Sequence, residues 1–390
     1  MKKTLLAAAL TLGFAGVAQA ETSVTLYGII DTGIGYQKVE GQNGVDAKKT
    51  GLVNGVQSGS RFGLKGSEDL GNGLRAVFVL ESGFNSSNGF SGQGGRLFGR
   101  QATVGLAGDA WGQLDLGRQT NIASKYFAGV ANPFGDAFGQ AGVTTTFGAA
   151  STARWDNMVM YQTPSFSGFQ FGVGYSFNTG TTNSGDDNST GTNDTNWDVD
   201  GAAENNNKGI TTGLRYSNGP IGAAVTYDQI KNDSIVGAGT SNKIKAWNLG
   251  LSYDFEVVKL HAGFGQTRDG WMDSDGYGGG AAAVNPGTGR GVTGANVGGN
   301  IFIEGLDANL YTVGLSAPLG NGSLMAAFNM ADFDDTNGRD FEKQHVYSLG
   351  YTYSLSKRTN VYAVGSYAKD LYGVDDTKSI FAGVGVRHQF

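Results

Sequence analysis

Several residue types that support catalysis or metal binding are absent or scarce in this chain. It has no cysteine, which excludes a disulfide framework, a thiolate metal site and a cysteine nucleophile. Its three histidines, His261, His345 and His388, lie far apart and form no HxxH or HExxH motif. A GxSxG motif is missing as well. The sequence therefore predicts a protein that is not an enzyme and has no catalytic residue, no cofactor and no metal site.

Proline and long apolar runs are also scarce. Only 5 prolines accompany 66 glycines, and the glycines follow no G-X-Y period, so a collagen-like or Pro/Gly low-complexity chain is excluded. The net charge of −6 argues against a nucleic-acid partner. Beyond residue 20 no apolar stretch is long enough for a transmembrane helix. The one apolar run, residues 4–17, follows Lys2 and Lys3 and precedes a small-x-small site, so residues 1–20 are predicted to be a cleaved signal peptide.

What the chain has instead is alternation with a period of two residues. In residues 169–177, Phe, Val and Tyr occupy one parity while Gln, Gly and Ser occupy the other, as on the two faces of a β-strand. Runs of this kind predict about sixteen strands, at 22–37, 57–67, 73–84, 96–108, 111–119, 154–164, 168–178, 208–218, 220–231, 243–254, 257–267, 306–316, 322–332, 344–355, 359–369 and 379–390. Short connections between them alternate with long polar ones, of which the longest are 119–153, 179–207 and 268–305.

Two architectures use this pattern. In a secreted β-sandwich or adhesin the apolar face packs inward, whereas in a membrane barrel it meets lipid and the polar face lines a lumen. Aromatic residues near strand ends, such as Trp155 and Tyr161, fit the interfacial girdles of a barrel. Small polar residues on the opposite face, an even strand count and alternating turns and loops favour the same architecture. The pattern favours the membrane barrel and leaves the secreted sandwich or adhesin as the alternative.

Five fragments carry a resemblance to a known family. They are VTLYG (24–28), SRFGLKGSEDLGNGLRAVFVLESGF (60–84), LFGRQATVGLAGDAWGQLDLGRQTN (97–121), RWDNMVMYQTPSFSGFQFGVGYSF (154–177) and the terminal GVGVRHQF. Taken in this order, they resemble the general porins of Gram-negative outer membranes, in particular the β-proteobacterial branch. The resemblance implies that residues 21–390 form an all-β fold, a 16-stranded antiparallel transmembrane β-barrel. It also implies a homotrimer that crosses the cell outer membrane many times.

The same resemblance implies where the pore narrows. In that family a long third loop folds into the lumen, which here assigns residues 119–153 to a constriction loop. Its stretch 132–136 (NPFGD) is similar to the family's PEFG-type loop tip but lacks the glutamate, so Asp136 is the expected acidic residue at the constriction. Family motifs carry an arginine ladder over to Arg61, Arg100 and Arg154.

Strand parity can be compared with these assignments. Arg61 shares a face with Gly63 and Lys65, away from Phe62 and Leu64. Glu81 is placed on a polar face in the same way, which makes it the second expected carboxylate. Asp136 and Glu81 are expected on the wall opposite the arginines, so that a transverse field crosses the constriction.

Arg100 does not fit strict alternation, which groups it with Val104 and Leu106. Either this strand turns small polar residues, Gln101, Thr103 and Gly105, toward a subunit interface, or Arg100 faces outward. We favour the first interpretation, because an arginine in lipid costs several kcal/mol.

The function expected from these residues is a water-filled channel for passive diffusion of small hydrophilic solutes and ions. Three arginines against two carboxylates predict weak anion selectivity, with the excess acids in external loops such as 179–207. A substrate-specific channel or a surface adhesin on the same barrel is the alternative. Expected partners are the chain itself, outer-membrane lipid and lipopolysaccharide. The sequence hint of a subunit contact is a less apolar outer face on the early strands, with Thr103, Gly105 and Gln113. Phe390 resembles the family's C-terminal signal for outer-membrane assembly. Asp-rich runs at 184–198 and 269–276 leave a calcium site conceivable, although neither completes a known calcium motif.

Overall fold

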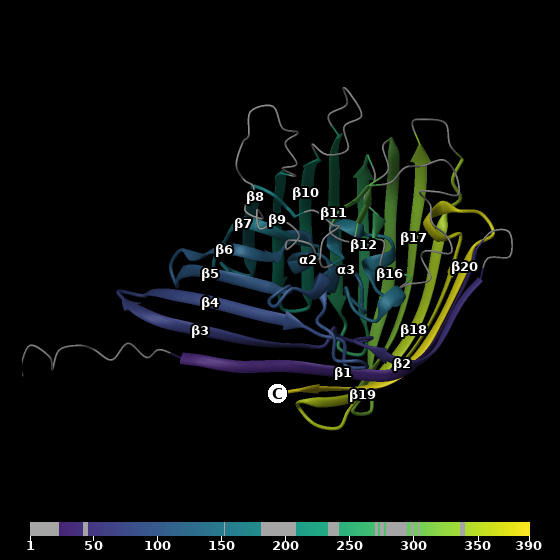
Figure 1. Cartoon of the computed structure of the whole chain (residues 1–390), viewed down its shortest axis with the longest axis horizontal. Helices are drawn as coiled ribbons and strands as arrows, with labels where there is room; N and C mark the ends of the chain where they lie inside the picture. Colours follow the sequence, from purple (N-terminus) through teal and green to yellow (C-terminus); the bar gives the residue numbers. More distant parts are fainter. Residues whose placement is uncertain are drawn as a thin grey trace, which may run out of the picture.

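Most of the described chain is β-strand. The computed structural model describes residues 23–41, 46–151, 153–180, 208–232, 242–269, 272–273, 277, 295–297, 300–302, 305–335 and 340–390 (Figure 1). The strands of the main sheet are β1 (Ser23–Glu40), β2 (Asp46–Asn54), β3 (Arg61–Gly71), β4 (Leu74–Gly83), β5 (Gln101–Gly108), β6 (Gly112–Thr120), β7 (Arg154–Gln162), β8 (Phe169–Ser176), β9 (Lys208–Asn218), β10 (Ile221–Asn232), β11 (Asn242–Asp254), β12 (Lys259–Arg268), β16 (Leu306–Leu319), β17 (Gly322–Asp335), β18 (Gln344–Ser354), β19 (Thr359–Lys369) and β20 (Lys378–Gln389). Three short strands, β13 (Met272–Asp273), β14 (Ala295–Val297) and β15 (Asn300–Phe302), form a separate small sheet.

The main sheet closes on itself as a barrel. From β3 to β20, each strand pairs antiparallel with the next strand of this sheet along the chain, and β1 pairs with β20 from Ile29 opposite Gln389 to Glu40 opposite Lys378. Both β2 and β3 pair with the same side of β1, one along its second half and the other along its first. They therefore occupy a single position in the barrel, interrupted at residues 55–60. Seventeen strands thus fill sixteen positions, as the sequence predicted.

Differences from the predicted strands are local. The pattern missed β2, whose sequence DAKKTGLVN has no apolar alternation. It also predicted a strand starting at residue 96, whereas the corresponding strand, β5, begins at Gln101. In the interruption, the backbone amide of Gly55 donates to the carbonyl of Asp31 and that of Ser58 to its carboxylate, at 3.0 and 2.6 Å. These bonds replace the ladder that the break removes.

The outer face of the barrel is apolar. Val104, Leu251 and Val384 are about half exposed, while residues of the opposite parity are buried or polar. Aromatic pairs flank this band at both ends of the strands, including Phe169 with Tyr216 at one end and Tyr175 with Phe177 at the other. An apolar band between aromatic girdles is typical of an outer-membrane barrel. The face exposed here would meet lipid.

Trp155 is an exception, and its sequence assignment to a girdle is wrong. The side chain is only 3% exposed and packs with buried Met158 and Met160. Asn157 has a φ of +48°, and the pairing with β6 shifts register at this point. The resulting bulge reverses the side on which the residues before it project. Trp155 therefore faces inward although strict alternation places it outside.

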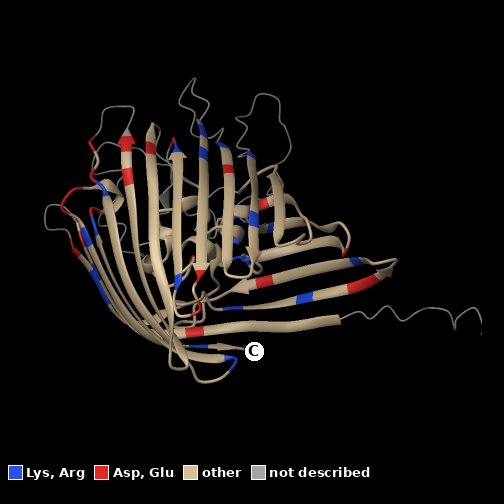
Figure 2. Ribbon diagram, turned by 180° about the vertical axis from the view of Figure 1, so that it is seen from behind, with Lys and Arg blue, Asp and Glu red and all other residues tan. Residues whose placement is uncertain are grey.

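The two ends of the barrel differ. Tight turns such as 72–73 and 219–220 join strands at one end, which we call the short-turn end, and both ends of the described chain lie there; long connections emerge at the opposite, long-loop end. Figure 2 shows charged residues mainly near strand ends, with long uncharged stretches between them. No helix in the described residues is long and apolar enough to cross a membrane.

The segment between β6 and β7 contains the helices α2 (Ile122–Tyr126) and α3 (Ala128–Ala131) and the 3-10 helices η3 (Gly139–Ala141), η4 (Val143–Thr145) and η5 (Gly148–Ala150). Figure 1 shows α2 and α3 beside β10, β11 and β12, and α2 contacts β9 and β10 while α3 contacts β11 and β12. Many residues of this segment are fully buried, among them Phe127 and Phe147. It therefore packs on the barrel wall instead of extending into solvent.

Glycines on successive strands make this packing possible. A Cβ atom on Gly263 would lie 2.8 Å from the Cβ of Ala131, and one on Gly350 would lie 2.7 Å from the ring of Phe134. Such distances are too short for any side chain other than hydrogen. The glycines that contact the segment in this way are Gly172, Gly213, Gly250, Gly263, Gly265, Gly314 and Gly350, from β8, β9, β11, β12, β16 and β18.

Candidate functional site

A cluster of charged side chains lies on the wall formed by β3, β4 and the start of β5. The Nε of Arg100 donates to Oε1 of Glu81 at 2.7 Å, and Nη1 of Arg61 lies 4.0 Å from the same oxygen. Tyr27 of β1 donates its hydroxyl to Oε2 of Glu81 at 3.0 Å. These side chains are largely buried, with 23%, 14% and 11% of Arg61, Glu81 and Arg100 exposed. Such shielding strengthens their interaction relative to one on an open surface.

Arg100 reaches this cluster for a reason that neither sequence interpretation included. The strand begins at Gln101, so Arg100 precedes it and is not bound by its alternation. Within β5, Val104 and Leu106 are exposed outside, whereas Thr103 and Ala107 are buried. The expected inward position of Arg100 is thus observed, but the reason given for it, an outer face of Gln101, Thr103 and Gly105, is wrong.

The three residues of β5 and β6 that hinted at a subunit contact lie on the inner face of the barrel, so they do not indicate such a contact. Thr103, Gly105 and Gln113 do not form a polar outer surface, because Thr103 is buried and Gln113 donates to the buried carboxylate of Asp115 at 2.9 Å. Gly105 packs against the same Asp115. These residues belong to the inner face.

Asp136 comes from the packed segment and faces the arginines. The residue is accessible to water, but protein surrounds its carboxyl closely enough for desolvation to raise the pKa of Asp136. The positive charges of Arg154, Arg61 and Arg100 act in the opposite direction and lower that pKa. Arg154 itself lies within electrostatic range of Arg100 and Arg61. The structure therefore brings together all five residues that the sequence analysis selected.

Their arrangement differs from the expected one in one respect. Glu81 does not lie across the lumen from the arginines, because β4 is the immediate neighbour of β3 and β5 and its carboxylate is paired with Arg100. Asp136 is thus the carboxylate on a separate segment. Arg387, which the family motifs did not indicate, also belongs to this region: its Nε donates to Oγ of Ser58 at 2.9 Å, and it lies within electrostatic range of Arg61. Its parity on the last strand, opposite the apolar residues, was the available signal.

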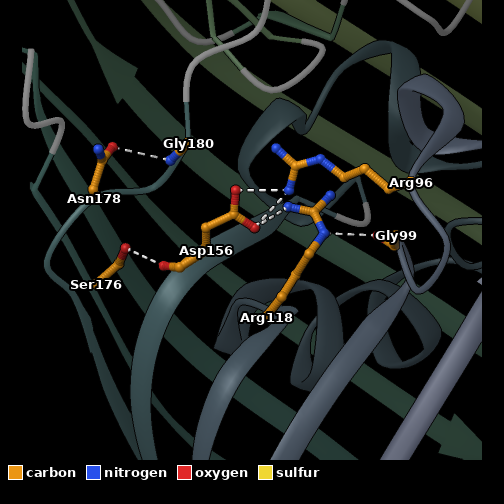
Figure 3. Close-up of polar contacts among 7 residues, drawn as sticks. All are labelled: Arg96, Gly99, Arg118, Asp156, Ser176, Asn178 and Gly180. Carbon is orange, nitrogen blue, oxygen red and sulfur yellow. Dashed lines mark hydrogen bonds and ion pairs between the residues drawn. The ribbon is translucent and has the colours of Figure 1, made fainter. Parts of the chain in front are cut away.

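A second ion cluster joins the ends of β6 and β7 to the loop before β5. Nη1 of Arg96 and Nη1 of Arg118 both approach the carboxylate of Asp156, at 2.7 and 2.6 Å (Figure 3). Arg118 also donates to the carbonyl of Gly99 at 2.7 Å. In the β5–β6 ladder Arg118 lies opposite Ala102, and Ala102 is on the same face of β5 as the exposed Val104. The side chain of Arg118 therefore projects from the outer side of β6. This cluster fixes the loop 84–100 and with it the position of Arg100.

The opposite wall holds the packed segment with buried amide side chains. Nδ2 of Asn121 donates to Asp228 of β10 at 2.7 Å, and Nδ2 of Asn132 donates to Asn329 of β17 at 2.9 Å. Gln344 of β18 donates to the carbonyl of Thr145 at 2.7 Å. A buried donor or acceptor that loses its hydrogen-bond partner destabilises the fold, so each of these bonds opposes displacement of the segment.

Phe390 exchanges backbone hydrogen bonds with Gly28, both 3.1 Å, so the last residue takes part in the seam between β20 and β1. Residues 1–20, which the sequence predicts to be a signal peptide, and run 184–198 lie outside the described residues, as does most of run 269–276. Among the described residues, no group of three His, Asp or Glu side chains is placed to hold a metal ion.

A closed barrel with an apolar outer band and charged side chains on its inner wall defines a membrane-channel class of protein. The family model for Gram-negative porins matches residues 5–371 of the chain. An outer membrane porin protein of Bordetella pertussis is 54% identical over 402 residues and another of Delftia acidovorans is 30% identical over 417 residues, with both chains fully covered in each case. An anion-selective porin from Comamonas acidovorans superposes with a TM-score of 0.66 at 27% identity, over 95% of this chain and 100% of that one.

The chain belongs to the Gram-negative porin family. It is a multi-pass β-barrel protein of the outer membrane, and its relatives are channel proteins rather than enzymes.

Proposed function

We propose that the protein forms a water-filled channel through which small hydrophilic solutes and ions diffuse passively, with weak anion selectivity. The observation that carries the proposal is the charge balance of the site. Arg61, Arg100 and Arg154 converge there with two carboxylates, Glu81 and Asp136, and Arg387 lies next to them. A sixteen-stranded barrel is too wide for its wall side chains to fill, so water and ions can occupy the remainder.

In this proposal the segment 119–153 is the constriction loop. Its packing on the glycine-lined wall supports that role, because the loop then takes up part of the barrel's cross-section at a fixed position. The Phe134 and Phe138 rings pack against Val56 and Tyr362, so the interruption at 55–60 meets the loop from the other side. Two inward segments would thus border the narrow passage.

The proposed selectivity arises from fixed charge at the passage. Glu81 neutralises Arg100 within the same wall, which leaves Arg61 and Arg154 facing Asp136 with a net positive charge. Guanidinium groups suit this role because they remain protonated at any physiological pH. Anions gain a modest attraction and cations a similar repulsion, while water in the passage keeps both effects small. The anion selectivity of the Comamonas relative supports the same sign.

The reversal potential of the purified protein in a planar bilayer tests this proposal. Under a KCl gradient we expect a potential displaced toward the chloride equilibrium value, together with unblocked conductance that rises with salt. Preference for potassium would overturn the selectivity, and the absence of ion-conducting steps would overturn the channel itself.

We further propose that the chain assembles as a homotrimer, contacts outer-membrane lipid and lipopolysaccharide, and loses residues 1–20 on export. Phe390 is assigned to assembly, in agreement with its position at the seam. Phe390→Ala keeps the backbone bonds to Gly28 but removes the ring. We expect less folded trimer in membranes, measured as heat-modifiable bands on gels, with refolding in detergent unaffected; unchanged assembly in cells would contradict the assignment.

A further inference from the structure

A cavity of about 410 Å³ lies between α2 and the short-turn end of the barrel, away from the arginine cluster. Its walls come from the loop helices α2 and α3, from the turns at 163–168 and 219–220, and from the adjoining ends of β8 to β12. The volume falls within the range of sites that hold small organic ligands. None of the five residues of the proposed constriction lines it.

Three cations from three different elements line this cavity. Lys125 comes from α2, Arg215 from the end of β9 and Lys259 from the start of β12. Asp254 is the single carboxylate among the lining residues. Within the described part of the chain, neither Arg215 nor Lys259 has an ion-pair partner. Asp254 lies directly opposite Lys259 in the β11–β12 ladder, and Asp115 interacts with Lys125, so the three positive charges of the lining are only partly balanced.

Two of the cations, Arg215 and Lys125, contact neutral groups. The guanidinium of Arg215 stacks over the ring of Tyr126 at 4.8 Å from its centroid, an arrangement that fixes its plane and leaves its N–H donors free. Nζ of Lys125 donates to Oε1 of Gln119 at 3.2 Å. Burial lowers the pKa of Lys125 and Arg215 lowers it further, while Asp115 opposes the shift. A bound anion would relieve this repulsion between two neighbouring cations.

Neutral hydrogen-bonding groups complete the lining. Ser217 and Ser252 present hydroxyls, and Oε1 of Gln170 is buried without a hydrogen-bond partner in the described structure. A planar guanidinium together with ammonium groups matches a phosphate dianion. The cavity is larger than a phosphate group alone requires. The serine hydroxyls and the Gln170 amide are therefore available to bind a hydroxylated carbon chain attached to the phosphate.

We propose that this cavity is a binding site for small phosphomonoesters of polyols, on the periplasmic side of the proposed constriction. The assignment of the short-turn end to the periplasm follows the topology of outer-membrane barrels. The proposal rests on the channel function above, because the ligand would reach the cavity through the pore or from its periplasmic mouth.

Single-channel recordings can test the site with the protein as it exists. Because the chain has no cysteine, Lys357→Cys in an exposed short turn allows each inserted channel to be oriented with an impermeant thiol reagent. Conductance and reversal potential in KCl are recorded first, so failure of the channel function is seen independently. Glycerol 3-phosphate, inorganic phosphate and glycerol are then added to one side at a time.

We expect glycerol 3-phosphate to reduce the current at a lower concentration from the short-turn side than from the long-loop side, and inorganic phosphate to act more weakly. Arg215→Gln and Lys259→Gln should each raise the half-blocking concentration about tenfold or more, as expected for the loss of a hydrogen bond to a charged group. Arg358→Gln, which removes one exposed charge from the β18–β19 turn and lies outside the cavity lining, is the matched control and should have no effect.

Three results would overturn the site. These are equal block from both sides, a half-blocking concentration unchanged in both cavity variants, or an effect of glycerol as large as that of its phosphate. Block by inorganic phosphate as strong as by the ester would overturn the phosphomonoester assignment. In each case the variants must run as folded, heat-modifiable protein, which separates loss of binding from loss of structure.

Discussion

The two walls of the barrel interior are built in opposite ways. The wall from β3 to β7 has short strands, 8 residues in β5 and 9 in β6, and carries the arginines and Glu81. The wall from β8 to β18 includes strands of up to 14 residues and carries glycines and buried amides that hold the loop. One wall keeps charged groups beside a water-accessible space, and the other is covered by protein.

In the proposed channel, this difference would let one fold hold a fixed loop on one wall and leave a passage along the other. Glycine lets the loop backbone approach the sheet closely, and paired amides satisfy the polar groups that this contact buries. Arginines on the opposite wall are long, charged and supported by ion pairs, so they project toward the space the loop leaves. Changes on the first wall should therefore alter selectivity, and changes on the second should alter loop stability.

The largest expected effect is on the charged wall. Removing two cations with Arg61→Gln and Arg100→Gln should move the chloride-to-potassium permeability ratio toward potassium by roughly 25-fold at low salt. A unit charge about 8 Å from the ion path contributes about 0.5 kcal/mol in water, with opposite signs for the two ions. The reversal potential measures this, and Arg358→Gln in an exposed turn is the control. An unchanged ratio would show that these arginines lie outside the path.

Glu81→Gln should change the same ratio in the opposite direction. Removal of one negative charge from the wall favours chloride by roughly fivefold on the same arithmetic, while the amide oxygen still accepts the hydrogen bond from Arg100. The measurement is again the reversal potential. A shift toward potassium would contradict the placement of Glu81 beside the passage.

On the loop wall, Gly263→Val should loosen the loop. The new side chain would collide with Ala131 and Phe127, because a Cβ there already lies 2.8 and 3.1 Å from them. We expect a loss of about 1–3 kcal/mol in stability, seen as a lower unfolding temperature, and noisier current with little change in the permeability ratio. Gly365→Val is the matched control, since no atom lies within 4 Å of a Cβ at that position. Equal effects of both variants would contradict the packing argument.

The smallest effect is expected for Ser379→Ala, which removes the 2.7 Å bond from the hydroxyl to Oε1 of Gln140 in the loop. Gln140 keeps its bond to Ser366, so the cost should be about 1 kcal/mol. Thermal unfolding measures the loss, and Ser67→Ala on β3, away from the loop, controls for removing a strand hydroxyl. A loss of several kcal/mol would mean that the loop depends on this one contact.

Period-two alternation predicted the barrel and its sixteen positions because lipid requires an apolar outer face on every strand. It failed where the backbone leaves regular pairing. The bulge at Asn157 turned Trp155 inward, and the start of β5 at Gln101 released Arg100 from its parity. The cluster of Arg96, Arg118 and Asp156 joins distant segments, which no local pattern indicates. Motif resemblance supplied the arginines, but only the pairing of strands places Glu81 among them.

The break between β2 and β3 has a consequence for assembly. Its anchor, Asp31, accepts a 2.6 Å hydrogen bond from the hydroxyl of Tyr362, which lies 331 residues further along the chain. Bringing such distant residues together costs loop-closure entropy, so we expect this contact to form late, after the intervening strands have paired. Residues 55–60, which would border the proposed passage next to Arg61, thus acquire their full support only when the final strands reach the first one. Closing the barrel and shaping its interior are then one event, and a chain halted before that event would have a wall without a finished pore.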